Sequence, residues 1–429
     1  MLAWFSANAR DLPWRRTRDP YAIWVSEIML QQTQVKTVVP YWKRWMRELP
    51  TIEAVAKARL EKIHKLWEGL GYYTRARNLQ KAAKQIVAQH DAHSKPRRRR
   101  GNESQTKKEL ETPSAFARLR RDKHVVSYKF PDNFDDVLAL PGIGRYTGGA
   151  ICSIAFNQPA PILDGNVIRV LTRVFGIGQN PREKKTNAYL WRLAEELVVH
   201  ASANNSRTRT KDEDEERSAC SHFNQSLMEL GALVCTPRNP QCPVCPVKKL
   251  CVAFRENRAA ELPNLGRRTA TTTRRFIAFV IERNGKFLVR QRPAGVVNAH
   301  LWEFPNVEIG TRLSRPQAAV SEFSALRVTD PRSESVADVA AQLFGSSPTS
   351  INHLCTVKHS ITRYRITLEA FRVQLGGRSS TTPKIFGTRR VRPSETGVWQ
   401  SPAQMNRLAF TSAHKKLASA ATDCILSGR

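Results

Sequence analysis

The sequence predicts a mainly α-helical domain over residues 1–260, followed by an α+β domain over residues 276–429. Amphipathic helical patterns with short breaks occupy most of the first region. The turn LPGIG at 140–144 joins two of these patterns, and its flanking glycines are typical of a helix-hairpin-helix. In the second region, apolar runs at 276–281 and 287–290 surround an Asn-Gly pair, which indicates a β-hairpin. The stretch between the two regions, 261–275, is the predicted linker.

The composition suits a protein that binds a polyanion. The chain has 429 residues, and 69 Lys and Arg against 37 Asp and Glu give a formal net charge of +32. Such an excess favours nucleic acid as the partner. Part of this positive charge lies in a predicted basic insertion at 93–127. Taken alone, such an insertion would indicate only a solvated loop. A second polar insertion is predicted at 201–219.

Targeting signals are not evident in the sequence. No apolar run is long enough to span a membrane, and no secretory signal pattern occurs near the N-terminus. The helical pattern begins almost at Met1, which leaves little room for a transit peptide. We therefore expect a location in the bacterial cytoplasm, or in the nucleus if the source is eukaryotic. We also expect a monomer.

The first strong helical pattern carries a candidate proton donor. A helix is predicted from residue 21, because Asp19 can cap it and Pro20 suits its first turn. Glu27 has apolar neighbours in this helix. Burial would raise the pKa of its carboxyl and allow it to donate a proton near neutral pH. Periodicity alone favours the alternative, in which Glu27 faces water.

The hairpin and the aspartate that follows it form a second candidate site. The N–H groups that begin the helix after Gly144 suit a DNA phosphate, so Gly142, Ile143 and Gly144 are predicted DNA contacts. Asp164 follows about twenty residues later, and a carboxylate near a phosphate-binding turn suggests catalysis. A PGIG turn alone would indicate only a common helix end.

A second glycine-rich turn, GLGYY at 69–73, carries aromatic side chains. Rings at such turns can wedge between bases or stack on them. Packing in the core is the alternative role for these tyrosines.

Four of the eight cysteines have the spacing of a metal-binding loop. Four thiolates can hold a [4Fe–4S] cluster or a tetrahedral zinc ion. Structural zinc usually takes two close pairs, whereas only one pair is close here. The predicted ligands are Cys235, Cys242, Cys245 and Cys251.

Taken in order, these motifs resemble the adenine DNA glycosylases of the MutY family, and the resemblance spans nearly the whole chain. It implies a helix-hairpin-helix glycosylase fold with a [4Fe–4S] loop, then an α+β MutT/Nudix-like domain. The matching stretches are SEIMLQQTQV at 26–35, GLGYYTRARNL at 69–79, LPGIGRYTGGAI at 140–151, LDGNVIRVLTR at 163–173, FNQSLMELGALVC at 223–235 and VRQRPAGVVNAHLWEFPN at 289–306.

The resemblance implies excision of adenine mispaired with 8-oxoguanine, or more weakly with guanine, from double-stranded DNA. The adenine would be flipped into a pocket. Glu27 would protonate its N7. Asp164 would stabilise the oxocarbenium-like sugar, electrostatically or through a transient covalent bond, until water adds. Tyr146 and Asn166 would orient these groups.

The resemblance also implies the residues that contact the DNA. Arg15 and Gln225 match positions that contact the flipped adenine. Gln32 and Tyr72 match residues inserted into the base stack, and Leu30 is also expected to lie close to the stack there.

Two departures concern the second domain. The family usually reads 8-oxoguanine through a Phe-Ser-His loop, whereas this chain has HSITR at 359–363. Thr362 keeps a hydroxyl, but Arg363 replaces the histidine. No Nudix box occurs in 276–429, so we expect this domain to bind the lesion without hydrolysing nucleotides.

Two other functions compete with this one. Endonuclease III, a relative, has a lysine after its hairpin that forms a Schiff base with the sugar. This chain has Tyr146 there, so a monofunctional glycosylase is predicted rather than a lyase. The third hypothesis is a module that binds damaged or bent DNA without catalysis.

Overall fold

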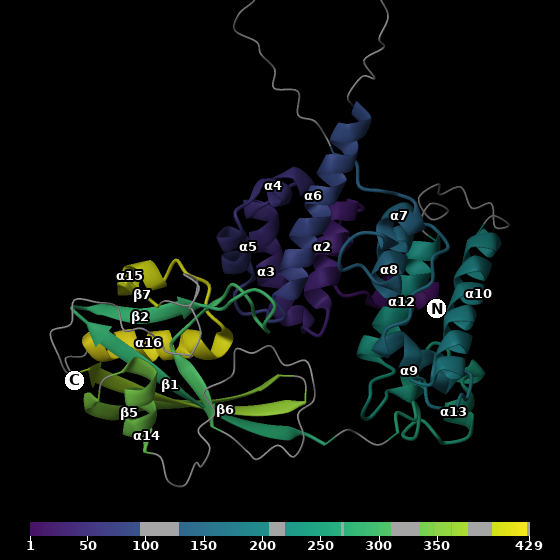
Figure 1. The fold of residues 1–429 in the computed structure, drawn as a ribbon. Helices are drawn as coiled ribbons and strands as arrows, with labels where there is room; N and C mark the ends of the chain where they lie inside the picture. The colour runs from purple at the N-terminus through teal and green to yellow at the C-terminus, as the bar shows by residue number, and fades with distance from the viewer. Residues whose placement is uncertain are drawn as a thin grey trace, which may run out of the picture.

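The chain folds into a helical part and a part built around a β-sheet (Figure 1). The computed structural model describes residues 1–94, 128–205, 219–266, 270–309, 335–345, 347–361, 363–375 and 397–426. Within these ranges, no helix combines the length and the apolar character needed to cross a membrane. Most of the predicted basic insertion, from residue 95 to 127, lies outside the described ranges.

The first half of the helical part packs around α2, in which nearly every residue is buried. The capping prediction is confirmed, because the Asp19 carboxylate accepts the Tyr21 backbone N–H at 3.0 Å. Fully buried Trp24, Trp45 and Trp67 anchor the core around it. The elements are α1 (Leu2–Asn8), η1 (Pro13–Arg15), α2 (Pro20–Leu30), α3 (Val35–Glu48), α4 (Ile52–Lys57), α5 (Leu60–Trp67) and α6 (Thr74–Ser94).

The second half contains the predicted hairpin, between α7 and α8. The helix α10 continues to Asn205 and α12 begins at Ala219, so helical structure covers both ends of the predicted polar insertion. The elements are α7 (Phe134–Leu138), α8 (Arg145–Phe156), α9 (Gly165–Val174), α10 (Lys184–Asn205), α12 (Ala219–Leu233), η3 (Cys242–Val244), η4 (Lys248–Leu250) and α13 (Val252–Arg255).

The second part is a mixed sheet between two helices. The strand β1 begins at Thr272, four residues before the predicted start, and pairs in parallel with β6 and antiparallel with β2 and β4. The strand order is β3-β2-β1-β6-β5. The elements are β1 (Thr272–Arg283), β2 (Lys286–Gln291), β3 (Trp302–Glu303), β4 (Asn306–Ile309), α14 (Val336–Phe344), β5 (Pro348–Ile361), β6 (Tyr364–Leu375), β7 (Val398–Gln400), α15 (Pro402–Met405) and α16 (Ser412–Leu426).

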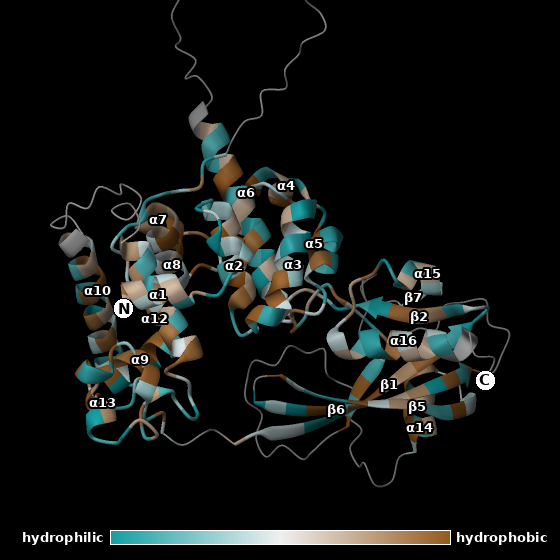
Figure 2. Cartoon of the chain, turned by 180° about the vertical axis from the view of Figure 1, so that it is seen from behind, coloured by the Kyte–Doolittle hydropathy of each residue, from teal (hydrophilic) through white to brown (hydrophobic). Residues whose placement is uncertain are grey.

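Alternation along β1 gives this sheet two apolar faces. Ala278 and Val280 pack under α16, whereas Ile277 and Phe279 pack under α14. The centre of β1 is accordingly hydrophobic in Figure 2. The predicted α+β domain is confirmed, and so is the mainly helical region that precedes it.

Candidate active site

Glu27 lies inside the helical core and not on a wet face. Its helix, α2, contacts η1, α3, α6 and α8, so little of the helix surface reaches water. Only 4% of Glu27 is exposed. The alternative that periodicity favoured for this residue is therefore wrong, because α2 is surrounded by other helices.

The environment of Glu27 makes it a weak acid. The Tyr146 hydroxyl, from α8, donates a hydrogen bond to Glu27 Oε2 at 3.1 Å. Burial raises the pKa of Glu27 to about 7; the Tyr146 hydrogen bond opposes this rise, and the charge of Asp164 adds to it. A carboxyl of this pKa is poised to donate a proton near neutral pH.

Asp164 is held at the N-terminus of α9. Its Oδ1 accepts the backbone N–H groups of Asn166 at 3.0 Å and Val167 at 2.8 Å, and its Oδ2 accepts the Asn166 side chain at 2.9 Å. Burial raises the pKa of Asp164, and these hydrogen bonds partly offset the rise. Asp164 and Tyr146 also interact electrostatically. The structure thus brings Glu27, Tyr146, Asp164 and Asn166 together.

A buried arginine connects this site to the cysteine loop. Arg169 donates to Asn166 Oδ1 at 2.9 Å and to the Cys235 carbonyl at 2.6 Å. The backbone at Gly231 also lies close, since a Cβ there would come within 2.7 Å of the Asn166 Cβ. Asn166 is therefore fixed from both sides.

Sequence reasoning missed Glu229, which holds the predicted adenine contact Arg15. The Glu229 carboxylate is fully buried and accepts Arg15 Nη2 at 2.8 Å and Arg10 Nη2 at 2.7 Å. Burial raises the pKa of Glu229, but hydrogen bonds from Arg10 and Arg15 outweigh it and lower the pKa to about 2. Gln225, one helical turn earlier in α12, is also buried and donates to Ser221 at 3.0 Å.

The hairpin glycines have different roles. Gly142 has a φ of +84°, and a Cβ there would lie 2.6 Å from the Asn78 Cβ. Gly144 is the extended N-cap of α8, with no side-chain cap, and a Cβ there would meet open space. Ile143 is buried between them. Gly142 therefore shapes the turn, and Gly144 leaves room for a ligand at the helix N-terminus.

Gln32 and Tyr72 both adopt left-handed backbone conformations, with φ of +57° and +45°. Such strain in non-glycine residues is often found at functional sites. Tyr72 is 41% exposed, and Leu30 ends α2 beside this region. A cavity of about 230 Å³ joins these turns to the hairpin. Its lining residues are Ile28, Gln31, Gln32, Tyr72, Thr74, Arg75, Asn78 and Gly142.

A second residue missed by sequence reasoning, Arg75, holds the two turns in place. Its guanidinium donates to the carbonyls of Gln31 at 2.6 Å and Leu70 at 3.0 Å, one next to each turn. Burial lowers its pKa to about 10. It also lies over the Tyr72 ring, 5.7 Å from the centroid.

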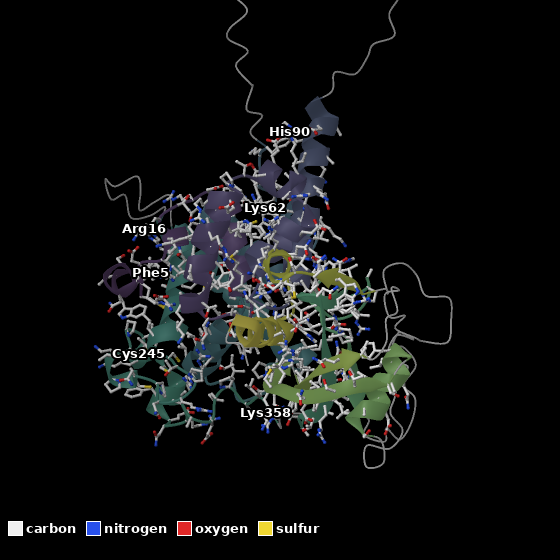
Figure 3. The ribbon with its side chains drawn as sticks, turned by 90° about the vertical axis from the view of Figure 1, so that its left-hand side faces the viewer. Phe5, Arg16, Lys62, His90, Cys245 and Lys358 are labelled. Carbon is white, nitrogen blue, oxygen red and sulfur yellow. The ribbon has the colours of Figure 1, made fainter. Side chains whose placement is uncertain are left out.

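The four predicted metal ligands line one small cavity beside α9 and α12. Arg173 donates to Cys235 Sγ at 3.4 Å. Figure 3 places Cys245 at the end of the helical part away from His90. Within the described ranges, no three His, Cys, Asp or Glu side chains converge as ligands of a single metal ion. A tetrahedral zinc ion requires its four sulfur ligands to lie within about 4 Å of each other, and the four cysteines do not converge in this way.

In the second domain, Thr362 lies outside the described residues. Its neighbour Arg363 lies between β5 and β6, with its guanidinium over the Tyr364 ring and a 3.1 Å hydrogen bond to the Tyr364 hydroxyl.

This arrangement agrees with the comparisons to known proteins. The profile of HhH-GPD superfamily base excision DNA repair proteins matches residues 25–196, and the NUDIX domain profile matches residues 277–420. The hairpin, the buried acid and the capping aspartate therefore belong to a helix-hairpin-helix DNA glycosylase of base excision repair.

The relatives narrow this class to one enzyme family. The adenine DNA glycosylase of Rattus norvegicus is 31% identical, over 97% of this chain and 76% of its own length. That of Homo sapiens is 32% identical, over 97% and 72%. That of Buchnera aphidicola subsp. Schizaphis graminum is 33% identical, over 72% and 74%. The chain belongs to the adenine DNA glycosylase family, which confirms the resemblance.

Proposed function

We propose that this glycosylase removes adenine paired with 8-oxoguanine or guanine in duplex DNA, and that it has no lyase activity. The observation that carries the proposal is the buried Glu27 carboxyl, with a pKa of about 7, bonded to Tyr146 and electrostatically coupled to Asp164. These groups provide an acid and an anion in one site, as hydrolysis of a glycosidic bond requires.

In the proposed reaction, Glu27 gives its proton to N7 of the flipped adenine. The N-glycosidic bond then breaks, and its electron pair leaves with the base, which departs as neutral adenine. The Asp164 carboxylate stabilises the positive charge left on the sugar. Water adds to the sugar carbon and gives up a proton to the Glu27 carboxylate, which restores the acid. Asn166 keeps Asp164 in place through its 2.9 Å hydrogen bond.

Tyr146 supports the absence of lyase chemistry. A Schiff base with the sugar needs an amine nucleophile. At this position the side chain is a phenol, and burial raises its pKa well above the ordinary value, so the hydroxyl stays neutral. It orients the Glu27 carboxyl by hydrogen bonding.

The DNA would lie across the two turns and the hairpin. The α8 N-terminus at Gly144 would bind a backbone phosphate, with Gly142 and Ile143 shaping the turn. Gln32 and Tyr72, near Leu30, would enter the space vacated by the flipped nucleotide. Arg15 and Gln225 would contact the adenine. Arg15 acts electrostatically on Glu27 and is held by the buried Glu229, and Gln225 is buried one helical turn before Glu229.

The second domain would read the base opposite the adenine. Its match to the NUDIX profile and the HSITR stretch at 359–363 support this role. Thr362 would donate or accept a hydrogen bond from the lesion, and Arg363 would supply a cation where the family has a histidine.

The cysteine loop would hold a [4Fe–4S] cluster. The residues fit such a group, because the four cysteines line one cavity and the Arg173 guanidinium, a fixed positive charge, donates to one of the sulfurs. Cys235, Cys242, Cys245 and Cys251 would be the ligands. When bound, the cluster supplies a cross-link that fixes the basic loop after α12.

The proposal is tested with duplex DNA that contains adenine opposite 8-oxoguanine. Incubation followed by alkali should break the strand at the adenine, whereas incubation without alkali should leave it intact. Borohydride trapping of a protein–DNA adduct would instead favour a lyase. A wild-type protein that binds this DNA but releases no adenine would favour a binding module.

A further inference from the structure

The two domains meet at a buried carboxylate. Glu68, the C-cap of α5, is 6% exposed. Its Oε2 accepts Lys415 Nζ at 2.8 Å and Lys65 Nζ at 3.0 Å, and its Oε1 accepts the Phe410 backbone N–H at 3.1 Å. Two of these three donors come from the second domain.

Further contacts surround this carboxylate. Lys65 Nζ also donates to the Leu408 carbonyl at 3.0 Å, and Arg77 Nη1 donates to the Ala299 carbonyl at 3.1 Å. Leu301 and Ala409, from the second domain, are buried in the same apolar cluster as the helices. The domains are thus joined by polar and apolar contacts, not only by the linker. In Figure 1, the yellow segment between α15 and α16 runs along the side of the second domain that faces the helical part.

The residues on either side of the Gly69–Tyr72 turn form hydrogen bonds with the same residue of the second domain. Glu68 precedes the turn and accepts the Phe410 N–H, and Tyr73 follows it and donates to the Phe410 carbonyl at 3.4 Å. Phe410 is itself fixed in the second domain, since its ring stacks on Phe304. A movement of either domain would therefore move the turn that carries Tyr72.

We propose that Glu68 is a positioning residue that couples the second domain to the Gly69–Tyr72 turn. Through it, binding of the base opposite the adenine by the second domain would fix the position of Tyr72 in the base stack. This inference rests on the proposed function, in which Tyr72 enters the base stack and the second domain reads the opposite base. Loss of the Glu68 charge leaves Lys65 and Lys415 without their shared carboxylate and loosens the junction.

The test compares single-turnover adenine release opposite 8-oxoguanine and opposite guanine. Glu68→Gln should lower the ratio of these two rates about tenfold, the effect of losing one charged hydrogen bond. Lys415→Met should also lower this ratio. The Lys415 side chain is half exposed, so its replacement should not disrupt the core. Glu53→Gln, on the neighbouring α4, is the matched control because its ion pair with Lys57 is on the surface, and it should leave the ratio unchanged.

A merely structural role would slow both substrates equally and leave the ratio unchanged, which would overturn the proposal. Hydrogen exchange gives a readout without activity: amides at 408–411 and 69–73 should exchange faster in Glu68→Gln than in Glu53→Gln. Equal exchange in the two variants would also overturn it. If the wild type releases no adenine from either substrate, the proposed function fails, while the exchange result still decides whether Glu68 joins the domains.

Discussion

At the scale of single residues, the pKa of Glu27 depends on its position inside α2. Desolvation favours the neutral carboxyl, and the fold retains that carboxyl because Tyr146 gives it one hydrogen bond. The cost of burying this group should appear in the stability of the protein.

Glu27→Gln should therefore make the protein more stable at high pH. The folded-state pKa, about 7, lies above the ordinary 4.5. The fold thus binds this proton more tightly than the unfolded chain. The resulting stability is complete below pH 4.5 and is lost as pH rises through 7. Between pH 5 and pH 8, the wild type should lose about 2 kcal/mol relative to Glu27→Gln.

Urea unfolding at both pH values measures this difference. Glu53→Gln serves as the control, because it makes the same substitution at a partly exposed surface position instead of in the core. A constant offset between the wild type and Glu27→Gln across this range would contradict a raised pKa.

Single residues also mark the limit of sequence reasoning. The sequence identifies Glu27 as a helical residue with apolar neighbours, but burial depends on α3, α6 and α8, which come from later segments. Glu229 binds Arg15 across 214 positions, and no local pattern indicates such a pair. Only the resemblance to a family favoured Glu27 as the acid over the alternative in which it faces water.

At the scale of elements, the helix α9 and its cap combine structure with chemistry. Asp164 stabilises α9 by accepting two backbone N–H groups. The same carboxylate is proposed to stabilise the sugar cation, and suitable substitutions can separate these two roles.

Asp164→Asn should keep the cap and lose the activity. Asparagine caps helices about as well as aspartate, so the free energy of unfolding should change little. Asp164→Ala should lose about 1 kcal/mol of stability as well as the activity. Thermal unfolding and single-turnover adenine release measure the two effects. Full activity in Asp164→Asn would contradict the proposed role of the charge.

Elements with strong local signals could be predicted from the sequence. The helices α3 and α5 follow clear amphipathic periodicity, and Asp19 and the glycine turns mark several helix ends. By contrast, β5 was missed because its residues are mostly half-buried or exposed, and so show no clean apolar alternation. The roles of Gly142 and Gly144 also differ, since only Gly142 has a positive φ.

At the scale of the whole molecule, two features combine distant segments. The contacts around Glu68 link the two domains. The cysteine loop packs against α9 and α12 in the helical domain. The loop reaches the active site through Arg169, which bonds both Cys235 and Asn166. A change at the cysteines should therefore affect the active site.

The purified protein should be brown and contain iron and acid-labile sulfide. Cys245→Ser should lower the iron content and the stability, because one of the four thiolate ligands is lost. Metal analysis and visible absorption measure this. Cys355→Ser is the control, since that thiol lies in the second domain. A colourless protein with stoichiometric zinc would contradict the proposed cluster.

The central claim is that Glu27 donates the proton that releases adenine. The most direct test is the pH dependence of single-turnover adenine release. The wild-type rate should fall tenfold per pH unit above about 7, where the acid is lost. The rate for Glu27→Gln should be far lower and should show no such fall. A wild-type rate in Glu27→Gln, with the same pH profile, would contradict the account.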